Sequence, residues 1–142
     1  MRLFTALFFI IFCTLTGLVV AAPPSPEFIG GTTRVTAEEL IDLANRLPKL
    51  VIIDARMRGD RVHGYIEGSV SLPNVETDCK SLARVIPAKT TPVLFYCNGV
   101  KCGRSAVSAR IAVKCGYEQI YWFRGGFEEW KAKGYPFLKQ PS

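Results

Sequence analysis

The sequence is poor in the residues that bind metals and nucleic acids. Its 142 residues include a single histidine, and no second closely spaced pair of ligands accompanies it, so a metal site is not expected. Lys and Arg outnumber Asp and Glu by 18 to 12. Because these basic residues are scattered, with no run of them interleaved with aromatics, nucleic acid is not an expected ligand. The net charge of +6 instead suits a small anion, and no cofactor is predicted.

The N-terminal segment differs in composition from the rest of the chain. After Arg2, residues 3–20 are almost uninterruptedly apolar and are followed by the small residue Ala21, which is the pattern of an export signal. We expect residues 1–21 to be a signal peptide and the protein to be exported to the periplasm. The competing interpretation is an uncleaved membrane anchor facing the periplasm, since about 20 apolar residues span a bilayer.

One small domain follows this segment. Residues 22–27 are proline-rich and predict a short extended linker. Residues 28–142 have the length of a single domain, and their apolar content allows a core without disulfide staples.

Patterns typical of strands and helices alternate along this domain. Short apolar runs predict strands at 50–53, 93–96 and 120–123, and a weaker alternation predicts another at 70–72. Apolar residues at helical spacing predict helices at 36–47, 79–86, 105–115 and 127–133, the first with a capping box. The alternation predicts an α/β fold with a mostly parallel sheet, in which ligands collect at the carboxyl ends of the strands.

A cysteine lies at one of these strand ends. Cys97 follows the apolar run 93–96 and precedes a polar loop, behind which a helix begins at Ser105. The residues of this loop are Asn98, Gly99, Val100, Lys101, Cys102, Gly103 and Arg104. Backbone N–H groups, a helix N-terminus and two cations would surround the thiol with positive potential and stabilise its reactive thiolate. Cys97 is therefore the predicted nucleophile, and the alternative is an ordinary buried free cysteine.

The other loop residues have predicted supporting roles. We expect Arg104 to bind an anionic donor through a two-pronged contact, with help from Lys101 unless Lys101 is only a solvated loop tip. Asn98, Gly99 and Gly103 are expected to supply main-chain donors and backbone conformation rather than side-chain chemistry.

Further candidates lie at the ends of other strands. Asp54 and Arg56 are predicted to form a supporting ion pair beneath the loop, and Arg124 is a weaker candidate for its rim. The polar residues 58–61, beside His63, predict an exposed turn with a surface histidine.

The role of Cys102 stays open between three alternatives. It resolves a persulfide or sulfenate on Cys97 as a disulfide, modulates the loop as a free thiol, or bonds structurally to Cys79 or Cys115. Four cysteines lie outside residues 1–21 and permit three complete pairings, among which the sequence does not choose. Cys115 is otherwise expected in the core.

Four motifs in order resemble the single-domain rhodanese-like family. They lie at residues 51–56, 64–69, 97–105 and 125–136, and the resemblance covers about residues 28–138. It implies a three-layer fold, with a central sheet of about five mostly parallel strands and helices on both faces. It also implies sulfurtransferase chemistry, in which Cys97 takes a sulfane sulfur from a small anionic donor such as thiosulfate. The sulfur is carried as a persulfide and passed to cyanide or to a thiol, including a protein thiol.

The sequence departs from the family pattern at two places. Cys97 and Arg104 enclose six residues, a longer loop than in the usual sulfurtransferases or in the related dual-specificity phosphatases, although an exported subset has a similar Cys-Asn-Gly-x-x-Cys loop. Tyr65 stands where the family usually has a histidine, and His63 is not its equivalent. The alternatives to sulfur transfer are therefore thiol-disulfide redox or oxidation sensing by Cys97 and Cys102, a phosphatase or oxyanion reductase, and a noncatalytic binding module.

Overall fold

The computed structural model describes residues 24–141. The expected signal peptide or membrane anchor therefore lies outside the described residues. Within them, none of the helices has the length and hydrophobicity needed to cross a bilayer. The strands are β1 (Thr33–Arg34), β2 (Val51–Asp54), β3 (Val70–Ser71), β4 (Val93–Tyr96) and β5 (Ile120–Phe123). The helices are α1 (Ala37–Arg46), α2 (Cys79–Val85), α3 (Arg104–Lys114) and α4 (Gly126–Ala132), with 3-10 helices η1 (Arg58–His63) and η2 (Asn74–Glu76).

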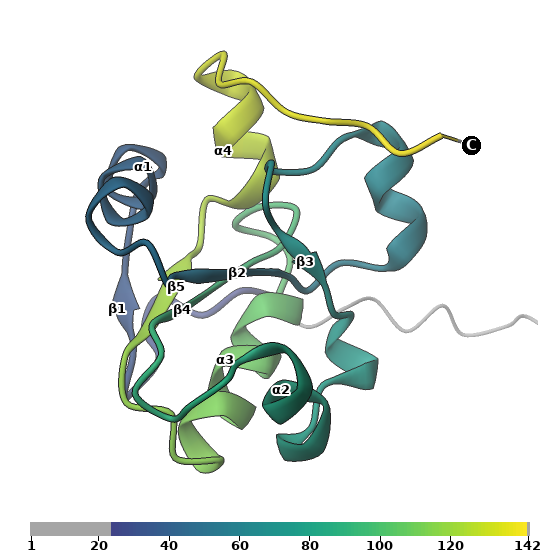
Figure 1. Ribbon diagram of the computed structural model, residues 1–142. Coiled ribbons are helices and arrows are strands. Elements are labelled where there is room, and N and C mark those ends of the chain that lie inside the picture. The colour runs from purple at the N-terminus through teal and green to yellow at the C-terminus, as the bar shows by residue number, and fades with distance from the viewer. Residues whose placement is uncertain (1–23, 142) are drawn as a thin grey trace, which may run out of the picture.

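The five strands form one parallel sheet in the order β1-β5-β4-β2-β3. Helices α1 and α4 cover one face and α2 and α3 the other (Figure 1). Residues of the central strand β4 alternate between these two layers. Val93 and Phe95 pack in the core beneath α2 and α3, whereas Leu94 and Tyr96 pack beneath α1 and α4. The predicted three-layer α/β fold is confirmed.

The predicted elements are present, with ends that shift by one or two residues. The capping box of α1 is formed, because the N–H of Glu39 donates to Thr36 and the Glu39 carboxylate accepts from the Thr36 N–H. Strand β1 and the two 3-10 helices were not predicted, since two to six residues are too few to show a period.

A disulfide between Cys79 and Cys115 ties the start of α2 to the end of α3, with a Cα–Cα distance of 5.5 Å. Cys115 packs half-buried against the core beneath α2 and α3, and it lies there as a disulfide partner of Cys79. The bond closes a loop over a sequence separation of 36, for which chain-entropy arguments give a stabilisation of about 4 kcal/mol.

Candidate active site

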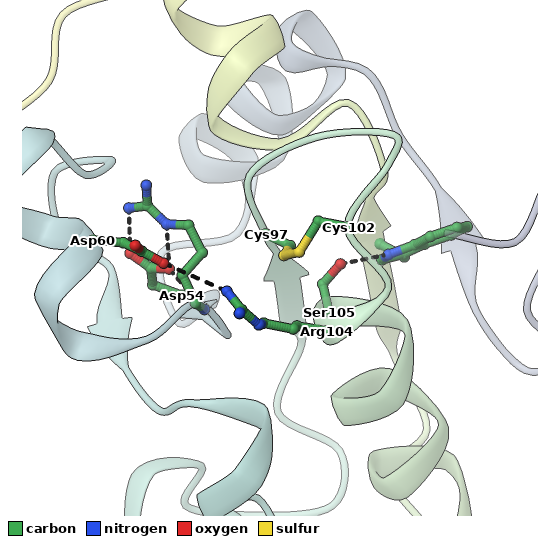
Figure 2. The surroundings of a disulfide bond; sticks show 8 residues. Asp54, Asp60, Cys97, Cys102, Arg104 and Ser105 are labelled. Carbon is green, nitrogen blue, oxygen red and sulfur yellow. Dashed lines mark hydrogen bonds and ion pairs between the residues drawn. A yellow bond between two sulfur atoms is a disulfide. The ribbon is translucent and has the colours of Figure 1, made fainter. Parts of the chain in front are cut away.

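The loop that begins at Cys97 lies at the carboxyl edge of the sheet, between β4 and α3 (Figure 2). The loop folds back on itself, because the Cys102 N–H donates to the Gly99 carbonyl oxygen at 2.9 Å. This brings the Cα atoms of Cys97 and Cys102 to 6.2 Å, and the two residues form a disulfide. Cys97 is only 1% exposed, whereas Cys102 is partly exposed.

The start of α4 holds the Cys97 side of the loop in place. The N–H of Phe127 donates to the Cys97 carbonyl at 2.9 Å, and the N–H of Glu128 donates to the Asn98 carbonyl at 2.7 Å. These are N–H groups that a helix start leaves without partners inside the helix. Gly126 permits the approach, because its φ is 60° and a Cβ there would collide with the Cys97 carbonyl oxygen. The Gly125-Gly126 pair in the sequence was the signal for this contact, although it predicted only a chain break.

At the end of β2, which pairs with β4, the predicted ion pair between Asp54 and Arg56 is confirmed. Arg56 Nε and Nη2 donate to the two Asp54 oxygens at 2.8 and 2.7 Å, and both side chains are at least 98% buried. Burial opposes the charge on Arg56, but the hydrogen bonds and charge of Asp54 outweigh it and raise the pKa of Arg56. The guanidinium also lies over the Phe127 ring, 4.6 Å from its centre, so this pair connects β2 to α4.

Two further residues complete this buried cluster, and the sequence did not reveal either. Tyr96 Oη donates to Asp54 Oδ2 at 2.8 Å, and burial, together with the charge of Asp54, raises the pKa of Tyr96. Arg61 Nη1 donates to the same oxygen at 3.1 Å, and Arg61 also donates to the hydroxyl and carbonyl oxygens of Ser69. In this cluster two arginines, Arg56 and Arg61, pair with the single carboxylate of Asp54, so positive charge is in excess.

The expectation of an exposed turn at residues 58–61 is therefore wrong for Arg61. This residue is 5% exposed because η1 turns its side chain inward, over the Tyr65 ring and toward Asp54. His63 is exposed, as predicted. The sequence contained no periodic signal that would separate Arg61 from its solvated neighbours.

The two loop cations differ in their surroundings. Arg104 reaches from the start of α3 toward Asp60, and its Nη1 lies 3.6 Å from Asp60 Oδ2 (Figure 2). In this structure its guanidinium therefore faces a carboxylate, at a longer distance than in the buried pair. Lys101 is exposed beside Val100 at the loop tip.

Arg124 does not have the rim position that the sequence suggested. Its guanidinium donates to the Pro26 carbonyl oxygen at 2.7 Å and to Glu27 Oε1 at 2.6 Å. It therefore fastens the segment before β1 to the end of β5. From β5 itself, Trp122 Nε1 donates to Ser105 Oγ at 3.0 Å and anchors the first turn of α3. Figure 2 shows Ser105 at the start of this helix.

The site can carry out thiol chemistry on a single loop. Among the described residues, no group of three or more His, Cys, Asp or Glu side chains is placed to hold a metal ion. With the Cys97–Cys102 bond closed, the available reaction is thiol-disulfide exchange. Reduction of the bond would release Cys97 as a nucleophile at the carboxyl end of β4.

Known proteins match most of the described domain. The family model described as Rhodanese-like domain matches residues 36–133. The chain is 29% identical over 111 residues to the "Rhodanese domain-containing protein CG4456" of Drosophila melanogaster, covering 69% of this chain and 96% of that protein. It is 26% identical over 106 residues to the uncharacterized protein YibN of Escherichia coli, covering 74% and 71% of the two chains.

Solved structures share the fold. A thiosulfate sulfurtransferase from Pseudomonas aeruginosa superposes with a TM-score of 0.67 at 25% identity, over 78% of this chain and 21% of that chain. A polysulfide-sulfur transferase from Wolinella succinogenes gives a TM-score of 0.62 at 20% identity, over 78% and 80% of the two chains.

Proposed function

This chain belongs to the rhodanese-like family, and from that premise we propose that it is a sulfurtransferase or persulfide carrier that acts through Cys97. Its donor is a small anion carrying a sulfane sulfur, such as thiosulfate, and its acceptor is a thiol or cyanide. The observation that carries the proposal is the position of Cys97, at the end of the central strand, in a loop held by the start of α4 and next to Tyr96, which joins the buried cluster of Asp54, Arg56 and Arg61.

In the proposed reaction, the reduced Cys97 thiolate attacks the sulfane sulfur of thiosulfate. The bond between the two donor sulfurs breaks, sulfite leaves with the electron pair, and Cys97 keeps the transferred atom as a persulfide. An acceptor thiolate then attacks the outer sulfur of the protonated persulfide, and Cys97 departs as a thiolate. Two negative charges meet in the first step, so positive potential from α3 and the loop cations lowers its barrier.

The loop cations support an anionic donor to different degrees. Lys101 is exposed beside Cys102, where it can attract anions from solution. Arg104 is half-buried and only loosely paired with Asp60, at 3.6 Å. Its proposed role requires the guanidinium to turn from that carboxylate to the donor.

We extend the proposal to an exported protein, either periplasmic or anchored in the membrane and facing the periplasm. The support is the apolar segment 3–20 together with two disulfides in the described domain, which persist in oxidising compartments. Cell fractionation with protease accessibility tests this placement, and a protein found only in the cytosolic fraction contradicts it.

The decisive experiment is mass analysis of the reduced protein after exposure to thiosulfate, with peptide mapping. We expect one added sulfur atom on Cys97, and none in Cys97→Ser. Cys102→Ser is the matched control, because it changes the neighbouring sulfur and leaves the proposed nucleophile. Sulfur found on Cys102 in the wild-type protein, or loading that persists in Cys97→Ser, would show that the nucleophile is wrongly assigned.

Thiol-disulfide redox chemistry is the second candidate, and the bond between Cys97 and Cys102 favours it specifically. The same Cys102→Ser variant separates the two functions. Sulfur transfer to cyanide that continues without Cys102 favours the transferase. A protein that gains no sulfur but cycles between dithiol and disulfide favours the redox function.

A further inference from the structure

The two sulfurs of the active-site disulfide differ in their access to solvent. Cys97 is 1% exposed, and its carbonyl and that of Asn98 are fixed by the first N–H groups of α4. Cys102 is partly exposed and follows the loop tip, where Val100 is 46% exposed and Lys101 is also exposed. A thiol arriving from solution therefore meets Cys102 first.

Attack on Cys97 would have a structural cost that attack on Cys102 avoids. A thiol can reach this buried residue only if its surroundings move, and the Cys97 side of the loop is tied to α4 by the bonds from Phe127 and Glu128. At Cys102 the described backbone contact is a turn within the loop itself, from its N–H to Gly99. The part of the loop beyond Gly99, which itself lies against the Glu128 side chain, can therefore shift without breaking the hydrogen bonds from α4.

We propose that Cys102 is the entry residue for a reducing dithiol, and that the loop tip at Val100 and Lys101 is the surface on which the reductant docks. A thiolate of the reductant attacks Cys102 Sγ, the Cys97–Cys102 bond breaks, and its electron pair leaves on Cys97. The second thiol of the reductant then attacks the mixed disulfide, which releases Cys102 as a thiolate and the reductant as its own disulfide. Cys97 is free after the first of these two steps. The inference concerns opening of the disulfide and holds whether or not Cys97 carries sulfur.

The first test maps the mixed disulfide formed with glutathione. The full chain carrying Cys79→Ala and Cys115→Ala, which leaves one disulfide in the domain, is mixed briefly with excess glutathione, quenched with acid and alkylated with N-ethylmaleimide. We expect glutathione on Cys102 and maleimide on Cys97 in the peptide map. Glutathione found chiefly on Cys97 would overturn the proposal.

The second test uses variants in which the Cys97–Cys102 disulfide cannot form again. In the first test that bond can re-form and expel the bound glutathione. Glutathione is loaded onto Cys102 in Cys97→Ser and onto Cys97 in Cys102→Ser, and its release by dithiothreitol is timed. We expect release from Cys102 to be at least several-fold faster, and equal or reversed rates would contradict the difference in access. Sulfur loading is measured separately on the reduced protein, so failure of this inference and failure of the proposed function give different results.

The role of the loop tip has its own variant. Lys101→Glu reverses the charge beside Cys102. Compared with the wild type, we expect its Cys97–Cys102 disulfide to be reduced more slowly by anionic glutathione, with a smaller effect on reduction by neutral 2-mercaptoethanol. The difference should shrink as salt is added, because exposed charges are screened. Equal slowing of both thiols would remove Lys101 from the docking surface.

Discussion

Replacing Asp54 with asparagine is expected to be the most destabilising single polar change near the active site. One Asp54 oxygen accepts hydrogen bonds from Arg56, Arg61 and Tyr96, and the other accepts from Arg56 side-chain and backbone N–H groups. Asparagine keeps one acceptor oxygen and points an NH₂ group at guanidinium donors. It also leaves two buried cations without a counter-charge.

The expected loss in the free energy of unfolding is about 3–5 kcal/mol, the range for removing one partner of a buried ion pair. This is a large part of the 5–15 kcal/mol that a domain of this kind typically has. Asp60→Asn is the matched control, because it makes the same chemical change in a half-buried pair with a 3.6 Å separation. Such pairs contribute about 0–1 kcal/mol.

Urea unfolding of the oxidised protein, followed by far-UV circular dichroism, measures both variants against the wild type. If Asp54→Asn does not fold, the milder variant Tyr96→Phe is measured in the same way, because it perturbs the same buried cluster. It removes the donor to Asp54 and the hydroxyl that pairs with the Ile66 N–H and Ser69 Oγ, and it leaves both arginine contacts, so a loss of about 1–3 kcal/mol is expected. Equal, small losses for Asp54→Asn and Asp60→Asn would refute the view that the buried carboxylate is required to balance the arginines.

Two further changes probe the contacts around α4. Glu38 of α1 accepts a hydrogen bond from Lys133, which follows α4, and so links the two helices. Hydrogen bonds, first of all this one, lower the pKa of Glu38 from 4.5 to about 2. A lowered pKa means that this contribution is present above pH 4.5 and is lost as the pH falls toward 2. Glu38→Gln should therefore flatten the pH dependence of unfolding in that window, and an unchanged profile would contradict the linkage. Gly126→Ala should lower the free energy of unfolding by more than the about 1–2 kcal/mol that a positive φ costs, because the added Cβ would collide with the Cys97 carbonyl oxygen. It should also loosen the loop, so that reduced Cys97 is alkylated faster. Gly134→Ala has a similar φ of 74° with no atom near the added Cβ, so equal losses and equal alkylation rates in the two variants would contradict the contact with the Cys97 carbonyl.

The amino-acid sequence by itself determined the elements of the fold and the place of the nucleophile. Apolar runs, helical spacing and the capping box at Thr36 depend on residues close together in the chain, so the α/β order could be predicted from local patterns. Cys97 at the end of a buried strand followed from the same patterns. The pair between Asp54 and Arg56 was also predictable, since the two residues are only two positions apart.

The tertiary structure decided which distant residues complete the site. Tyr96 reaches Asp54 across a sequence separation of 42, and the start of α4 reaches the loop from about 30 residues away. The cysteine pairing was decided in the same way, because Cys79 meets Cys115 only where α2 packs beside α3. Charges such as Arg61 and Arg124 look alike in the sequence. Their partners depend on which segments the sheet brings together, and that arrangement arises from burial of the whole core rather than from any local pattern.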